Sequence, residues 1–394
     1  MARDDQPVNE GMDAESFEAF LEQLDRWVRE RLIPNEERTI ELNRVPDDIR
    51  QEMVEMGLFG ITTPEQYGGA GMKTSQYIET MKRISYAAPA YRSLLSINVG
   101  MVTTALVKGG TEEQRQEWLP KLIDGTIAAF ALTEPGSGSD SAGLTTTAVR
   151  DGDDYVLNGT KRYITNAPFA DMVIVMARTS KENLPKNRHV SAFLVPTDAP
   201  GVTIGKPDDK MGQAGAQIAD VILEDARIPA RNLLGGQEGG GFSVAMQSLD
   251  NGRLSIAACS TAYAQRALDS GLRYATERKA FGEPISGFQL IQAMLADSKA
   301  EIYASECMIK DATAKADTGA RVSMEAACAK MFASEMCGRV VDRVVQIYGG
   351  AGYLKEYDAE RFFRDARLYR IYEGTTQIQQ LVIAKAMLRE VGAL

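Results

Sequence analysis

The hydrophobic residues of this 394-residue chain change their spacing twice along the sequence. From about residue 13 to 125 they recur every three to four residues, as Phe17, Phe20, Leu21 and Leu24 do, which predicts a helical N-terminal domain over residues 1–125. From 126 to 240 the spacing falls to two, which predicts a central β domain. Helical spacing returns over 241–394. We therefore expect an α+β, predominantly helical fold that ends in a C-terminal helical bundle.

The central region is expected to be an antiparallel sheet, because no ten-residue helical stretch separates its short strands. Gly, Pro, Asn and Asp bound these strands, and Asn158-Gly159 is expected at the tip of a hairpin. The predicted strands cover residues 128–133, 145–150, 155–158, 172–178, 190–196, 202–204 and 219–223.

Composition excludes several classes of protein. The chain has 44 Lys and Arg against 54 Asp and Glu, so its net charge of −10 argues against nucleic-acid binding. No apolar run approaches the roughly 20 residues that cross a bilayer. The polar opening segment Met1–Gln6 does not resemble a targeting peptide, so we expect no membrane association and a cytoplasmic location.

Metal and nucleophile chemistry have few candidates in this sequence. Its four cysteines form no CxxC pair, and its single histidine, His189, lies in a polar connector where a solvated ring is expected. The sequence therefore predicts no metal site. It also lacks the P-loop pattern and the strand-flanked G-x-G-x-x-G pattern, so a nucleotide cofactor would be held in another way.

Five segments carry the functional signal, although each alone is weak. They are FALTEPGSGSD at 130–140, KRYITNA at 161–167, ERKAFGEPI at 277–285 with its continuation to Gln292, QIYGGAGY at 346–353 and YEGTTQ at 372–377. In this order, over about 250 residues, they resemble the acyl-CoA dehydrogenase family, whose flavoproteins oxidise acyl-CoA thioesters to 2-enoyl-CoA. The resemblance covers nearly the whole chain and includes the three-part plan.

The resemblance implies an FAD cofactor. By the matched segments, Thr133 and Ser139 would contact the flavin pyrimidine edge and phosphate region, and Thr165 would hydrogen-bond the ring at N5 or O4. Tyr163 stands where the family commonly has Trp, and an aromatic contact with the ring survives that change. The other cofactor contacts implied near this site are Phe130, Leu132, Thr375 and Gln377.

A second group of implied contacts would serve the cofactor of a neighbouring subunit. Its members would bind the adenosine and pyrophosphate, for which the planar fork of an arginine is well suited. They are Arg278, Phe281, Gln289, Gln346 and Gly350. An FAD that spans two chains requires an oligomer, and the resemblance implies a homotetramer.

Glu373 matches the family's catalytic carboxylate in its commonest position. Removal of a proton α to a thioester needs a carboxylate in a dry site, where its pKa rises toward neutrality. Thr376 is expected to cap the following helix, which leaves Glu373 in a connector. Tyr372, Gly374 and Ser139 are implied substrate contacts. Arg253 matches a CoA contact, and a helix-surface ion pair is the alternative interpretation.

The segment Tyr91-Arg92-Ser93 bears on the choice of substrate. The glutaryl-CoA dehydrogenase branch holds a distal carboxylate with an Arg in such a segment, so Arg92 is a candidate substrate contact. In that branch a Glu lies seven residues earlier, where this chain has Ser85. Arg92 could instead be an exposed cation on a helix.

The expected function is therefore FAD-dependent α,β-dehydrogenation of an acyl-CoA, as in fatty acid β-oxidation. Glu373 would be the base, a β hydride would pass to flavin N5, and an electron-transfer flavoprotein would be the acceptor. The open alternatives are a glutaryl-CoA dehydrogenase that uses Arg92, and a catalytically silent binding or assembly member of the family. No feature marks an oxygen path, so an oxidase is not favoured.

Overall fold

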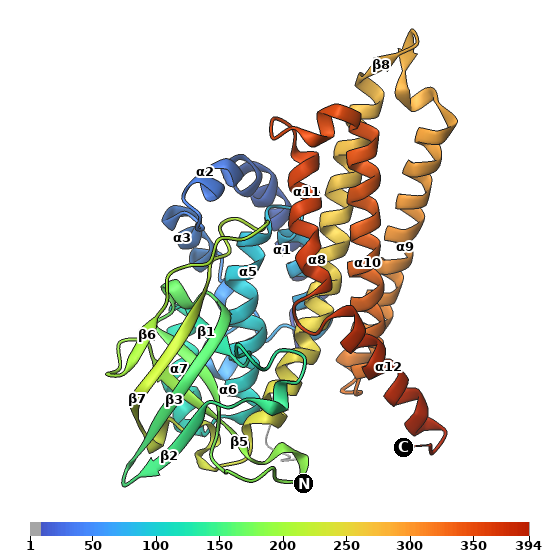
Figure 1. The fold of residues 1–394 in the computed structure, drawn as a ribbon. Helices are drawn as coiled ribbons and strands as arrows, with labels where there is room; N and C mark the ends of the chain where they lie inside the picture. The colour runs from blue at the N-terminus through green and yellow to red at the C-terminus, as the bar shows by residue number, and fades with distance from the viewer. Residues whose placement is uncertain (1–8, 394) are drawn as a thin grey trace.

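The computed structural model describes residues 9–393, so the opening segment Met1–Gln6 lies outside the described residues. Figure 1 shows the expected three parts in order: helices first, then a β domain, then a bundle of long helices. Across the described part of the chain, no helix is both long and apolar enough to cross a membrane.

The N-terminal helices end where local sequence signals place their ends. Thr111 and Gln114 form the predicted capping box at the start of α7, and Gly125 follows that helix with a φ of 93°. The helices of this part are α1 (Ala14–Trp27), α2 (Glu36–Glu41), α3 (Asp47–Glu55), α4 (Thr74–Ile84), α5 (Pro89–Ser96), α6 (Thr103–Gly109) and α7 (Glu112–Ile123).

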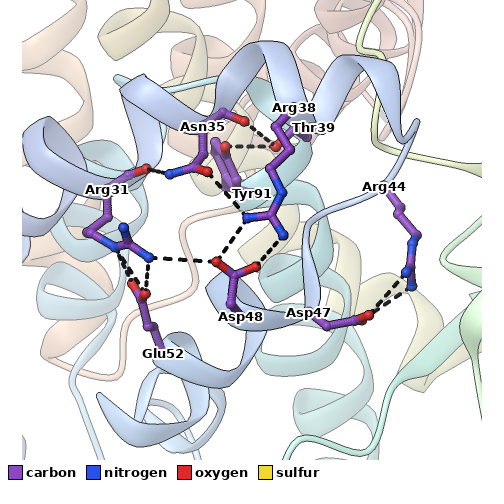
Figure 2. A network of polar contacts seen from close by, with 9 residues as sticks. All are labelled: Arg31, Asn35, Arg38, Thr39, Arg44, Asp47, Asp48, Glu52 and Tyr91. Carbon is purple, nitrogen blue, oxygen red and sulfur yellow. Dashed lines mark hydrogen bonds and ion pairs between the residues drawn. The ribbon is translucent and has the colours of Figure 1, made fainter.

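A polar network, shown in Figure 2, joins α3 to α2 and to the segment between α1 and α2. The Arg31 side chain makes paired bonds to Glu52, and Arg38 makes paired bonds to Asp48, with nitrogen–oxygen distances between 2.5 and 3.2 Å. These pairs are partly exposed, so each contributes little free energy by itself. They orient the helices, because each pair joins two different elements.

Buried polar contacts then hold α5, the helix that carries Arg92. The Tyr91 hydroxyl lies 2.8 Å from Thr39 Oγ1 and 3.0 Å from the carbonyl oxygen of Leu32. Glu36 accepts the N–H of Ala88 at the start of α5. These contacts fix the position and direction of α5 relative to the rest of the fold.

The central domain is a mixed sheet. Strand order is β1-β4-β2-β3-β7-β6, and β5 pairs with β4. The strands are β1 (Ala128–Ala131), β2 (Thr147–Asp151), β3 (Asp154–Thr165), β4 (Met172–Arg178), β5 (Val190–Pro196), β6 (Val202–Ile204) and β7 (Ile218–Pro229). The positions of the seven predicted strands are confirmed, and three of them match residue for residue.

Two predictions about this sheet are wrong. It is not purely antiparallel, because β1 and β4 pair in parallel from Ala128–Met172 to Ala131–Val175, and β2 meets the end of β4 in parallel. In the sequence the β2–β3 hairpin comes between β1 and β4, so the chain can return in the same direction without a helix. Asn158-Gly159 is not a hairpin tip but lies inside β3, at a register shift against β7.

His189 is buried rather than solvated, with 2 % of its surface exposed. Its Nδ1 accepts the N–H of Leu184 at 3.2 Å, so in the neutral ring Nε2 carries the proton and faces the Ala142 carbonyl at 3.3 Å. The ring therefore links the loop that contains Leu184 to the loop that contains Ala142. These contacts account for the burial of a histidine that lies in a polar connector.

The C-terminal part is a bundle around the long helix α8. Its elements are α8 (Gly241–Glu277), β8 (Lys279–Ala280), β9 (Glu283–Pro284), α9 (Gln289–Asp317), α10 (Ser323–Tyr348), α11 (Asp358–Ala366) and α12 (Thr376–Glu390). In Figure 1 the β8–β9 turn is at the end of the bundle away from α12. Residues of α8 belong to all three buried hydrophobic clusters of the described chain, and these clusters include residues of every part of the fold, so this helix connects the three parts.

Candidate active site

A cavity of about 410 Å³ opens where the three parts meet. Its walls come from α5 and the turn after it, from β1 and β3 with the loop after β1, from α8, and from α12 with the connector before it. Most of the site residues predicted near the flavin and substrate line it: Arg92, Phe130, Leu132, Thr133, Ser139, Tyr163, Thr165, Arg253, Tyr372, Glu373 and Gly374. Segments up to about 280 residues apart in sequence thus meet at one site.

Glu373 lies in the connector, as predicted, and its side chain is 11 % exposed. Its φ is 52°, a left-handed conformation that is uncommon for a residue with a side chain. Its Oε2 atom is buried and has no hydrogen-bond partner among residues 9–393. An unpaired buried carboxylate oxygen that borders a cavity is available to take a proton from a ligand.

The charge of Glu373 is set by opposing effects. Burial raises its pKa above the ordinary value, because it disfavours the ionised form. Arg92, Lys330 and Arg253 oppose that rise, in that order. The Arg92 guanidinium is the only one of the three within ion-pair distance in the described chain, with Nη2 3.8 Å from Glu373 Oε1.

Arg92 is buried in the cavity wall and is not an exposed helix cation. Its Nη2 donates to Ser255 Oγ at 2.9 Å, while its Nε has no partner within residues 9–393. Ser85 stands where the glutaryl-CoA branch has a Glu seven residues before its Arg. It is buried, and its hydroxyl donates to the Met81 carbonyl at 2.6 Å. The structure therefore places the buried guanidinium of Arg92, with an unpaired donor, in the cavity wall.

Arg253 also borders the cavity. It is buried, so the interpretation that placed it on an exposed helix surface is wrong. It does pair with Asp250 one turn earlier, at 2.5 Å, and Ser323 of α10 donates to the same carboxylate at 2.7 Å. Its Nε has no partner within the described residues.

The opposite wall of the cavity is built from the end of β1 and from β3. Thr133, Ser139 and Thr165 carry hydroxyls that make no hydrogen bond within residues 9–393. Tyr163 is 56 % exposed with a φ of 60°, and its ring borders the cavity. A Cβ added at Gly138 would meet no atom within 4 Å, so the backbone there is open to a ligand. This wall fits a planar, polar-edged group.

Two predicted cofactor contacts lie beside the cavity rather than in its wall. Thr375, not Thr376, caps α12, since its Oγ1 accepts the N–H of Ile378 at 3.2 Å. The cap falls one residue earlier than predicted because Thr376 is already the first residue of α12. Gln377 is exposed on the first turn of α12.

The second predicted group lies far from this cavity. Phe281, at the β8–β9 turn, is 97 % exposed, and Arg278, Gln289, Gln346 and Gly350 are exposed on the neighbouring elements of the same tip. None of the five lines the cavity of their own chain. The cofactor contacts predicted for these five residues are therefore not made from the wall of this cavity.

Sequence reasoning missed residues that lie behind the site. Lys330 of α10 is fully buried and its Nζ donates to the Gly374 carbonyl at 2.8 Å. Gly252 of α8 faces Glu373, and a Cβ there would overlap Oε2. A lysine among core-facing alanines was the available signal for Lys330, because Ala326, Ala329 and Ala333 mark the buried face of the helix.

Family models divide the chain in the same way as the structure does. The acyl-CoA dehydrogenase N-terminal, middle and C-terminal domain models match residues 14–126, 129–226 and 239–388. The chain belongs to the acyl-CoA dehydrogenase family. Members of this family are FAD enzymes, and the cavity wall described above has the hydroxyls and the open aromatic face that such a cofactor requires.

Three proteins illustrate what this acyl-CoA dehydrogenase family member is similar to. The probable acyl-CoA dehydrogenase YngJ of Bacillus subtilis is 44% identical and is matched over 93% of this chain and 97% of its own. The caffeyl-CoA reductase-Etf complex subunit CarC of Acetobacterium woodii is 42% identical over 89% and 92%. A glutaryl-CoA dehydrogenase from Mycobacterium smegmatis, solved in complex with FADH2, has a TM-score of 0.88 at 29% identity, over 95% of each chain.

Proposed function

We propose that this chain dehydrogenates an acyl-CoA thioester to a trans-2-enoyl-CoA, with Glu373 as the base that removes the α proton. The observation that carries the proposal is the unpaired, buried Glu373 Oε2 at a cavity whose opposite wall fits a flavin. Bound FAD would supply the acceptor, at N5, for the hydride that leaves the β carbon. Among residues 9–393, Glu373 is the only residue with a carboxylate that lines this cavity.

The surroundings of Glu373 suit proton removal from a weak carbon acid. Burial raises the pKa of the carboxyl, which makes the carboxylate a stronger base than it would be in water. The nearby cations oppose that rise, because they favour the ionised form of the carboxyl. Arg253, with a free Nε on the cavity wall, would contact the CoA part of the substrate.

A second candidate is the dehydrogenation of a dicarboxylyl-CoA such as glutaryl-CoA. Arg92 favours it, because a buried guanidinium with an unpaired Nε could bind a distal carboxylate. The M. smegmatis glutaryl-CoA dehydrogenase shares the fold at 29% identity. Ser85 weakens this candidate, since its hydroxyl is already bonded within α4 and its turn.

We further propose a homotetramer that passes its electrons to an electron-transfer flavoprotein. The exposed residues at the β8–β9 tip support assembly, because they lie far from the cavity of their own chain. The name of the related CarC places that protein in a complex with Etf, which supports a similar partner here. The cytoplasmic location remains a prediction for cell fractionation to test.

Anaerobic reduction of the purified flavoprotein tests this function. We expect a yellow protein that bleaches when butyryl-, hexanoyl- or glutaryl-CoA is added, and the fastest thioester identifies the substrate class. A protein that binds FAD but is bleached by none of the three would instead support a catalytically silent member of the family.

A further inference from the structure

The connector that carries Glu373 is held from behind by two buried side chains. Lys330 Nζ, from α10, donates to the Gly374 carbonyl at 2.8 Å. Gln379 Nε2, from α12, donates to the carbonyls of Glu373 and Gly374 at 3.1 and 3.0 Å. Both side chains have 0 % of their surface exposed. Side chains from two helices thus hydrogen-bond to the backbone carbonyls at the proposed base.

The backbone at this point needs an external restraint. Glu373 and Gly374 have φ values of 52° and 87°, and the left-handed region is unfavourable for the glutamate. No hydrogen bond within a regular helix or strand fixes these two residues, which lie between the turn at Arg367–Arg370 and α12. The surrounding side chains must therefore hold the conformation.

The conformation has a direct consequence for the carboxylate. It directs Oε2 against the bare Cα of Gly252, where any side chain would overlap it. The same arrangement leaves Oε2 without a partner and Oε1 3.8 Å from Arg92. A different φ at residue 373 would move the carboxylate away from this position beside Gly252.

We infer that Lys330 and Gln379 are positioning residues that hold the Glu373 backbone in its left-handed conformation and so aim its carboxylate into the cavity. This inference rests on the proposed role of Glu373 as the base. Lys330 has a second effect, which Gln379 lacks, because it also brings a positive charge behind the carboxylate.

The charges around Glu373 come from several elements. Arg92 faces it from α5, Arg253 from α8 and Lys330 from α10. Burial lowers the pKa of Lys330 to about 8, and Glu373 opposes that decrease. Removal of Lys330 takes away one of the three cations, so the pKa of Glu373 should rise further.

Matched variants separate the two effects. The rate of anaerobic flavin reduction is measured against pH, with the best of butyryl-, hexanoyl- and glutaryl-CoA, for the wild type, Lys330→Met, Gln379→Met and Lys330→Arg. We expect both methionine variants to lose about 10- to 100-fold in rate with little change in the substrate concentration for half-saturation. Only Lys330→Met should move the acidic limb of the curve of flavin-reduction rate against pH to higher pH. Lys330→Arg should return that limb to its wild-type position.

Exposed Lys310 of α9 provides the control, and Lys310→Met should behave as the wild type. A crystal structure of Lys330→Met, or of Gln379→Met if the first does not fold, gives a readout that is independent of activity. We expect residue 373 to leave the left-handed region. Wild-type rates in both methionine variants, or an unchanged φ at residue 373, would overturn the inference. A wild-type protein that no thioester reduces would refute the proposed function instead, while the crystal structure would still decide the positioning role.

Discussion

At the scale of single residues, the chemistry of Glu373 depends on what surrounds it. Burial raises the pKa of its carboxyl, and the guanidinium of Arg92, 3.8 Å away, is the largest influence that opposes the rise. Arg92 lies in α5 and Glu373 in the connector before α12, 281 positions later in the sequence, so only the fold brings them together. The base and the possible carboxylate-binding group are thus electrostatically coupled.

Substitution of Arg92 tests this coupling. In Arg92→Met the carboxylate loses its nearest cation, so its pKa should rise, and the acidic limb of kcat/KM should move up by about one to three pH units. The sign follows because the base acts when ionised, and a lost cation disfavours ionisation. The profile is measured with butyryl-CoA, and exposed Arg26 provides the control substitution. An unmoved limb would show that the ion pair has no influence on the base.

At the scale of elements, a buried ion pair anchors the loop that follows β1. Lys161 Nζ of β3 lies 2.7 Å from Glu134 Oε1, and Glu134 also accepts the backbone N–H groups of Thr145 and Thr146. Both charged side chains are almost fully buried. The pair therefore fixes Thr133, the residue next to Glu134, in the cavity wall.

Removal of one partner should be costly, because the other charge stays buried without compensation. We expect Lys161→Met to lower the free energy of unfolding by about 3–5 kcal/mol in urea titrations. The double variant Glu134→Gln/Lys161→Met should recover part of the loss. A loss below about 1 kcal/mol, typical of an exposed pair, would contradict this account.

Acid should act on the same element through Glu134. Burial alone would raise its pKa, but Lys161 and the hydrogen bonds from Thr146 and Thr145 lower it to about 2 from 4.5. A lowered pKa means that the stabilisation is complete above about pH 4.5 and is lost as the pH falls toward 2. Glu134→Gln should therefore flatten the stability profile in that range, and an unchanged acid profile would argue against the pair.

Local signals in the sequence predicted the elements well, but not how they pair. Strands β4, β5 and β6 match their predicted bounds, because turn residues flank each apolar run. The parallel pairing of β1 with β4 depends on contacts about 44 residues apart, and no local pattern reports it. Likewise, Glu373 was proposed as the base from its motif. The hydrogen bonds that Lys330 and Gln379 make to its connector depend on how α10 and α12 pack, and no local pattern predicts these bonds.

At the scale of the whole molecule, the chain carries its predicted cofactor contacts at two separate places. One group lines the cavity, and the other is exposed at the β8–β9 tip, at the far end of the bundle. Large exposed apolar side chains, Phe281 and Leu290, accompany the second group. Such a tip is well suited to enter the site of a second copy.

Arg278→Ala tests this shared site. The variant should fold normally, since Arg278 is exposed, but should lose FAD more readily on gel filtration because a contact to the diphosphate is missing. The flavin-to-protein absorbance ratio and sedimentation velocity measure cofactor and assembly together, with Lys310→Met as the control. A native monomer that retains a full complement of FAD would refute the shared site.

The most direct test of the central claim is anaerobic flavin reduction in Glu373→Gln. The amide is nearly isosteric with the carboxylate but cannot accept the α proton, so the variant should keep its FAD and its yellow colour. On addition of the acyl-CoA that bleaches the wild type, we expect a rate of flavin reduction at least about 100-fold lower. Rapid bleaching of Glu373→Gln would contradict the assignment of Glu373 as the base.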